Sequence, residues 1–122
     1  SLMAHIDEFQ IFFGDAKYHV ICLSETWLKP WIGDAMISLP GYKLFRLDRV
    51  GKQGGGVAFY LRDNLSASVI AHSAEVYCGR PGYIVAEITA GNASKLLAVV
   101  YRPPNISYLS DFEQLFLDLQ VK

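Results

Sequence analysis

The stretch Ile21–Pro30, ICLSETWLKP, begins as a continuous apolar run and then changes to polar side chains. The apolar run, which starts at Val20, predicts a β-strand that is covered on both faces. Ser24, Glu25 and Thr26 follow at its end, where a polar side chain can face a cleft while the sheet holds its backbone. Glu25 is therefore a candidate metal ligand, and the alternative is a solvated carboxylate at a strand end.

The composition is that of a single folded domain. The chain has 122 residues, of which 52% are hydrophobic, 19% charged and 13% aromatic. A chain of this length can bury a sizeable core without disulfides or a structural metal. Its formal net charge of −1 does not indicate nucleic-acid binding, so such a function would need a local basic patch.

The two cysteines and the start of the sequence indicate in which cellular compartment the protein is found. Cys22 and Cys78 lie in different settings without metal-type spacing, and we interpret both as reduced thiols of an intracellular protein. No apolar run has a membrane-spanning length, and no signal-peptide pattern opens the chain. The opening SLMAHIDEF, without an initial Met, is typical of a fragment or a processed product.

Hydrophobic periodicity predicts a mixed α/β (α+β) fold with two helices and six strands. A first helix is expected over residues 4–16, where apolar residues recur at helical spacing. A second is expected to open with a capping box of Ser110 and Glu113. Its apolar positions are Phe112, Leu115, Phe116 and Leu119. The expected strands are 19–26, 42–49, 56–62, 66–72, 83–89 and 96–101.

The connections predict how the strands pair. Short turn-forming stretches at 62–65 and 90–93 indicate hairpins, so we expect one mostly antiparallel or mixed six-stranded sheet. Strands such as VICL, YIVAEI and LLAVVY are apolar at consecutive positions, which implies that both of their faces are covered. Because two helices cover only one face of a sheet, the other face is expected to be uncovered.

A second notable stretch is Phe45–Leu65, FRLDRVGKQGGGVAFYLRDNL. Arg46, Arg49 and Lys52 place positive charge beside three glycines, which allow close approach of the backbone to a ligand or a positive φ. The glycines lead into a strand and lack a following Lys-Ser/Thr pair, which excludes a phosphate-binding P-loop. The alternative is a flexible hairpin with solvated cations.

The third stretch, LLAVVYRPPN at residues 96–105, repeats the design of the first. A buried strand ends in Tyr101 and Arg102, and two prolines hold the backbone before Asn105. The phenol of Tyr101 and the side-chain amide of Asn105 can donate hydrogen bonds to a phosphate oxygen. The alternatives are a strand-end aromatic residue and a turn-forming asparagine.

Together, and in this order, the segments ICLSETWL, FRLDRVGKQGGGVAFYLRDNL and LLAVVYRPPN resemble the first half of the endonuclease domain of non-LTR (LINE-type) retrotransposons. These reverse transcriptase-associated domains belong to the endonuclease/exonuclease/phosphatase superfamily. The resemblance covers nearly the whole chain. It implies half of a four-layer α/β sandwich, in a single partial domain over residues 1–122 that is truncated at both ends.

The resemblance also implies a chemistry, which is nicking of DNA by phosphodiester hydrolysis with Mg²⁺. By position, Glu25 matches the metal-binding carboxylate, Tyr101 the tyrosine that holds the scissile phosphate, and Asn105 a further phosphate contact. The expected DNA contacts are Arg49, Lys52 and Arg102. A DNA substrate implies a nuclear location.

Four departures from the family pattern limit this function. Between Ser1 and Lys122 there is no counterpart of the family's opening strand with its asparagine, its Gly-Asp-Phe-Asn-like motif, its later aspartate or its final Ser-Asp-His-like motif. We therefore expect little or no nicking by this chain alone, and a homodimer or domain swap through the uncovered sheet face. The alternatives are a non-catalytic remnant that acts as a homodimeric interaction module and a lipid or inositol phosphatase.

Overall fold

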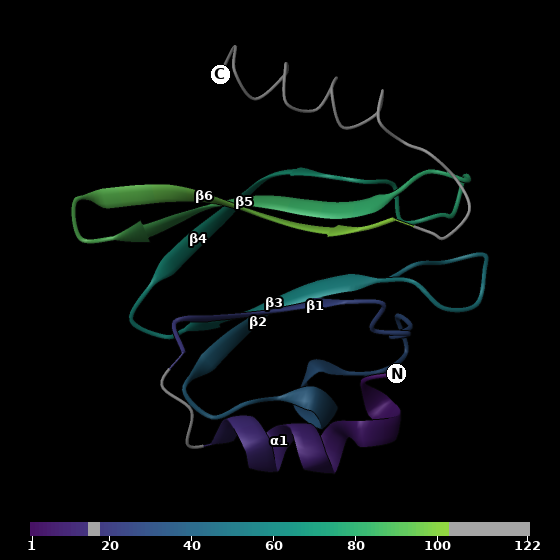
Figure 1. Cartoon of the computed structure of the whole chain (residues 1–122), viewed down its shortest axis with the longest axis horizontal. Coiled ribbons are helices and arrows are strands. Elements are labelled where there is room, and N and C mark those ends of the chain that lie inside the picture. The colour runs from purple at the N-terminus through teal and green to yellow at the C-terminus, as the bar shows by residue number, and fades with distance from the viewer. Residues whose placement is uncertain (15–17, 103–122) are drawn as a thin grey trace.

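A computed structural model describes residues 1–14 and 18–102. It contains six strands and one α-helix, arranged as stacked layers (Figure 1). The helical elements are η1 (Met3–His5), α1 (Ile6–Gly14) and η2 (Asp34–Ile37). The strands are β1 (Val20–Ser24), β2 (Tyr42–Leu47), β3 (Val57–Arg62), β4 (Ser66–His72), β5 (Gly82–Ala90) and β6 (Ala93–Tyr101).

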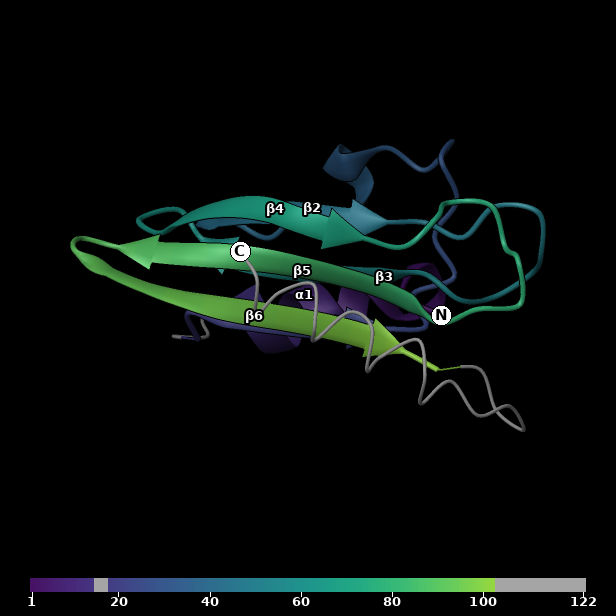
Figure 2. The same cartoon turned by 90° about the horizontal axis from the view of Figure 1, so that it is seen from above.

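The strands form two three-stranded antiparallel sheets, with the orders β1-β3-β2 and β4-β5-β6. The sheets lie face to face, and α1 lies on the outer side of the β1-β3-β2 sheet (Figure 1). Seen from above, β6 lies along the same long side as β1, and β4 lies over β2 on the other side (Figure 2). The architecture is therefore helix, sheet, sheet.

Strand β3 is the centre of the packing. Its residues from Val57 to Leu61 are each exposed by 1% or less, because both faces and both edges of the strand are covered. Alternate residues point to opposite faces. Val57, Phe59 and Leu61 pack against Ile84, Ala86 and Val99 of the second sheet. The other face of β3 packs toward α1.

On the helix side, Tyr60 joins α1, η2 and β3. Its ring lies 5.4 Å from that of Phe9 in α1, and its hydroxyl donates a hydrogen bond of 2.7 Å to the Ile37 carbonyl. Burial raises the pKa of Tyr60 from 10.0 to about 12, because the phenolate would lose its hydration. The neutral phenol is thus part of the folded structure.

The prediction of a single six-stranded sheet is wrong. Both edges of β3 are already paired, with β1 and with β2, so β4 cannot pair with it. The turn at 62–65, in which the Leu65 N–H donates to the Arg62 carbonyl (3.0 Å), instead carries the chain to the second sheet. The inner sheet face that was expected to be uncovered is covered by the chain's own second sheet.

Other expectations are confirmed at the level of elements. The first helix, the six strands and the 90–93 hairpin are present, with bounds within a few residues of those expected. Cys22 and Cys78 are free thiols. The second expected helix and Asn105 lie outside the described residues. No helix in the described part of the chain is long and apolar enough to cross a membrane.

The Tyr60 phenol predicts a pH-dependent stability. Folding raises the pKa of this phenol. Its contribution to the free energy of unfolding is therefore complete below pH 10.0 and is lost as the pH rises to about 12. In Tyr60→Phe we expect the free energy of unfolding at neutral pH to fall by about 2 kcal/mol, since the Ile37 carbonyl loses its donor. Urea unfolding at several pH values measures both effects.

The matched control is Tyr18→Phe, since the Tyr18 side chain is exposed. We expect its stability and pH profile to equal those of the unsubstituted chain. An unchanged alkaline decline in Tyr60→Phe would contradict the assignment of that decline to the buried phenol.

Candidate functional site

The end of β1 and the end of β6 meet at one end of the sandwich, on the right in Figure 1. There the Tyr101 hydroxyl donates a long hydrogen bond of 3.4 Å to Glu25 Oε1, although the two residues are 76 positions apart. Burial and the negative charge of Glu25 raise the pKa of Tyr101, and the positive charge of Arg49 opposes them. The phenol therefore keeps its proton and remains a hydrogen-bond donor.

The backbone that carries Glu25 has a special conformation. Glu25 has φ 58° and Trp27 has φ 60°, in the left-handed region that side-chain-bearing residues rarely adopt. Thr26 between them is buried, and its Oγ1 accepts the Leu28 N–H at 3.3 Å. The turn thus holds the Glu25 carboxylate outward while Thr26 anchors it in the core.

The turn is held by the glycine loop, which is formed by Gly54, Gly55 and Gly56 directly before β3. The N–H groups of Thr26 and Trp27 donate to the carbonyls of Gly56 (3.2 Å) and Gly55 (2.9 Å). A Cβ at Gly55 would lie 2.5 Å from Arg49 Nε, and one at Gly56 would lie 2.6 Å from Thr26 Oγ1. Both glycines have positive φ, +71° and +84°. They are buried, so the alternative of a flexible hairpin does not describe this loop.

Arg49 is fixed beside Tyr101 by the same loop. Its Nε donates to the Gly54 carbonyl at 3.1 Å, and its Nη2 donates to the Gln53 carbonyl. Its Cζ lies 4.7 Å from the centroid of the Tyr77 ring and 6.0 Å from that of Tyr101. The guanidinium charge is therefore positioned at the site, although two of its donors already bind the loop.

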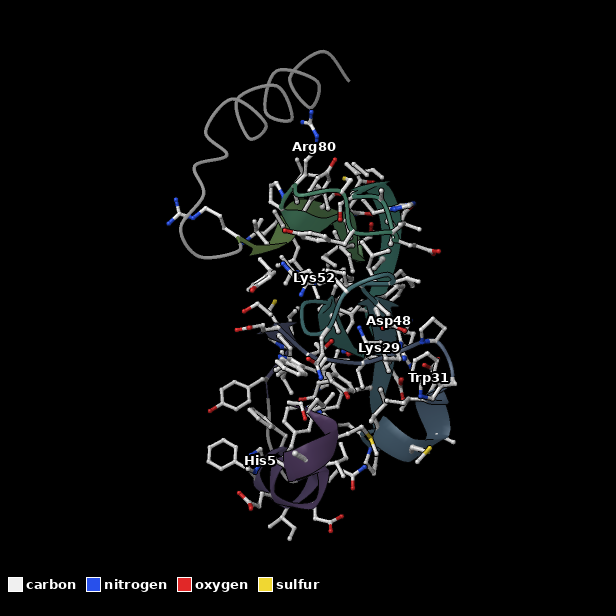
Figure 3. All side chains as sticks on the ribbon, turned by 90° about the vertical axis from the view of Figure 1, so that its right-hand side faces the viewer. His5, Lys29, Trp31, Asp48, Lys52 and Arg80 are labelled. Carbon is white, nitrogen blue, oxygen red and sulfur yellow. The ribbon has the colours of Figure 1, made fainter. Side chains whose placement is uncertain are left out.

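Two lysines complete the basic side of the site. The exposed Lys52 places Nζ 4.5 Å from the centroid of the Tyr77 ring. Lys29 Nζ donates to the carbonyls of Arg49 (2.8 Å) and Lys52 (2.9 Å), so it ties the glycine loop to the segment after β1. Figure 3 looks at this end of the sandwich and labels Lys29, Asp48 and Lys52.

Arg46, which the sequence groups with the basic residues, has a structural role. It forms ion pairs with Asp48 (2.8 Å) and Asp34 (2.9 Å), and it donates to the carbonyls of Lys29 and Ile32. With 14% of its side chain exposed, its charge is compensated inside the protein. Arg46 therefore joins η2 to β2 and is not a candidate ligand contact.

A cleft of about 290 Å³ opens beside Tyr101, between the ends of the two sheets. Its polar and aromatic lining includes Arg49, His72, Tyr77, Tyr83 and Tyr101. Backbone hydrogen bonds between Val50 and the segment 75–77, both of 2.8 Å, hold Tyr77 in this wall. The site thus combines a carboxylate, a phenol, a fixed guanidinium and an aromatic cleft.

The described residues fit one ligand position of a magnesium site. The Glu25 side chain is exposed, and its Oε1 accepts the Tyr101 hydroxyl. Within residues 1–14 and 18–102, no three His, Cys, Asp or Glu side chains form a group that could hold a metal. Mg²⁺ often uses one or two carboxylates and fills its remaining positions with water and phosphate oxygens. Glu25 can supply one such carboxylate.

The structure brings together four of the residues selected from the sequence, namely Glu25, Tyr101, Arg49 and Lys52. Arg102 is exposed directly after β6. Sequence reasoning missed Tyr77, for which the sequence carries no signal. No protein-family model and no curated protein matches the chain.

The packing of the glycine loop predicts that two Gly→Ala substitutions lower the free energy of unfolding by different amounts. Gly56→Ala adds a methyl group at 2.6 Å from Thr26 Oγ1 in a left-handed backbone, and we expect it to lower the unfolding free energy by about 3 kcal/mol. Gly41 has nearly the same φ, +83°, but a Cβ added there would have no atom within 4 Å. Gly41→Ala should therefore cost only about 1 kcal/mol. Equal losses in urea unfolding would contradict the close packing.

Proposed function

We propose that this chain is part of a metal-dependent DNA endonuclease of the retrotransposon type, which nicks DNA by phosphodiester hydrolysis. The observation that carries the proposal is the contact of Glu25 with Tyr101, 3.4 Å between Oε1 and the hydroxyl. The resemblance selects these two residues from segments far apart in the sequence, and both lie at the same end of the sandwich. The substrate would be nuclear DNA.

Each residue of the site has a proposed role in this chemistry. Glu25 would supply a carboxylate to Mg²⁺, and the bound ion would neutralise charge on the scissile phosphate. Tyr101 would donate its proton in a hydrogen bond to a phosphate oxygen, because its raised pKa keeps the phenol neutral. Arg49, Lys52 and Arg102 would contact the DNA backbone, and Asn105 would add a further phosphate contact.

We propose that the chain alone has little or no nicking activity. Glu25 would bind a metal ion and Tyr101 a phosphate oxygen. The resemblance assigns activation of the water to a carboxylate, and stabilisation of the phosphoryl charge to a histidine, in motifs that have no counterpart between Ser1 and Lys122. The chain would therefore bind DNA weakly and depend on further residues for hydrolysis.

We also propose that the complete fold is a four-layer sandwich, with a helical layer on the outer side of each sheet. On the outer face of the β4-β5-β6 sheet, Leu96 and Val100 are 57% and 38% exposed. The segment 110–119, predicted to be an amphipathic helix from its sequence, follows β6 closely. We propose that its apolar side covers this face, as α1 covers the other sheet.

A complementation experiment tests the proposed activity. The chain is mixed with a separately expressed second half of a LINE-type endonuclease domain and assayed for nicking of supercoiled plasmid in Mg²⁺. We expect nicking by the mixture and none by either half. Glu25→Gln should reduce the rate at least ~100-fold, because the metal loses its carboxylate.

Glu87→Gln is the matched control, since Glu87 is an exposed residue of β5. It should leave nicking by the mixture unchanged. Efficient cleavage by the chain alone that is abolished by Glu25→Gln would contradict the proposed inactivity. Equal activity of Glu25→Gln and the unsubstituted chain in the mixture would contradict the endonuclease proposal itself.

The second candidate is a non-catalytic, homodimeric interaction module. It is the alternative to a covered outer sheet face, and it is favoured by the apolar side chains of Leu96 and Val100, which are exposed in the structure. It predicts self-association that survives Glu25→Gln and Tyr101→Phe and is lost on polar substitution within Leu96–Val100. Sedimentation velocity of these variants measures the association, and the nicking assay of the mixture separates the two candidates.

A further inference from the structure

Among residues 1–14 and 18–102, nothing pairs with the outer edges of the two strands on one side of the sandwich. No described strand pairs with the outer edge of β1 or of β6, and β6 lies along the same side as β1 (Figure 2). β1 has no charged residue, and β6 has only Lys95 among its nine. Neither contains proline, and the β5–β6 register has no bulge. Such edges are open to pairing with another strand.

On the opposite side of the sandwich, the outer edges of β2 and β4 have features that hinder the addition of another strand. β2 has Lys43 among its six residues, and Arg46 in the same strand holds the charged side chains of Asp34 and Asp48 against it. β4 has a register shift between Val69 and Ala71, and irregularities of this kind block strand addition. The contrast between the two sides indicates that, of the four edges in the described part of the chain, those of β1 and β6 are suited to an added strand.

The register identifies the backbone groups that are open at β6. Ala90 and Ala93 flank the two-residue turn of the β5–β6 hairpin, so they form a hydrogen-bonded pair, and such pairs alternate along the ladder. The N–H and C=O groups that point away from β5 therefore belong to Ser94, Leu96, Ala98 and Val100.

The same reasoning applies to β1. The Arg62 N–H donates to the His19 carbonyl at 3.0 Å, so alternation leaves the outward groups of Val20, Cys22 and Ser24 unpaired by any described strand.

We propose that a second copy of this chain pairs with these two edges, β1 with β1 and β6 with β6, around one two-fold axis normal to the sheets. Antiparallel pairing that satisfies all outward groups of β1 must centre on Cys22. For β6 it must centre on Leu97, which places Lys95 opposite Val99 of the partner rather than opposite another charge. The result is a sandwich of two continuous six-stranded sheets.

A single axis can serve both pairings. Glu25 and Tyr101 are in contact, so the ends of β1 and β6 coincide. Cys22 lies three residues before Glu25, or about 10 Å along the strand. Leu97 lies four residues before Tyr101, or about 13 Å. The two centres thus nearly coincide along the strands, which favours a second copy over an unrelated strand.

This inference does not depend on catalysis. The pairing uses the outer edges of β1 and β6 and not the outer face of the β4-β5-β6 sheet. A failure of the nicking assay and a failure of self-pairing are therefore separate results.

Cross-linking at Cys22 tests the pairing directly. In the proposed dimer the two Cys22 residues are a hydrogen-bonded pair with Cα atoms about 5.5 Å apart, which suits a disulfide. The full chain with Cys78→Ser is oxidised by air with a copper catalyst, at mildly alkaline pH because burial raises the pKa of the Cys22 thiol. We expect a disulfide-linked dimer, and none with Cys22→Ser.

Sedimentation equilibrium supplies the second measurement. Ala98→Lys places two charges near the axis, and we expect it to weaken association at least ~10-fold. Ser68→Lys is the matched control, because Ser68 is exposed on the outer face of the same sheet but on the protected β4 edge, and it should not change association. A monomer at all micromolar concentrations, or a dimer without the Cys22 cross-link, would overturn the proposal.

Discussion

Complete burial of β3 is the constraint on which the structure depends. A strand covered on both faces needs a layer on each side, and here α1 supplies one and the second sheet supplies the other. Because β1 and β2 occupy both edges of β3, the next strand cannot pair with β3, and the chain crosses to a new sheet at residues 62–65. The sandwich thus follows from five consecutive apolar residues, Val57–Leu61, in a central position.

The same strand links the core to the candidate site. Gly55 and Gly56 precede β3, and their carbonyls accept the N–H groups of Trp27 and Thr26. The left-handed conformation of Glu25 is unfavourable alone, so the surrounding structure must impose it. Rigid packing of β3 supplies that constraint, and the Glu25 carboxylate is fixed near Tyr101 as a result.

Local patterns in the sequence predict the elements well and their assembly less well. Alternation and apolar runs located the six strands, and the positive φ of the glycines was expected from their residue type. The partition into two sheets was not predicted, because it depends on which strands occupy the edges of β3. Likewise, no local signal shows that Arg49 and Thr26 fill the space that a Cβ at Gly55 or Gly56 would need.

The fold separates the proposed site of chemistry from the strand edges proposed for association. Inner faces are filled by side chains, so polar groups collect where strands end, and this is where Glu25, Tyr101 and Arg49 lie. Strand edges that no described strand pairs with run along the sides, where β1 has no charged residue, β6 has only Lys95, and neither has the register shift of β4. Since the end and the side of the sandwich are separate surfaces, phosphate chemistry and strand pairing can coexist in one chain without competing for residues.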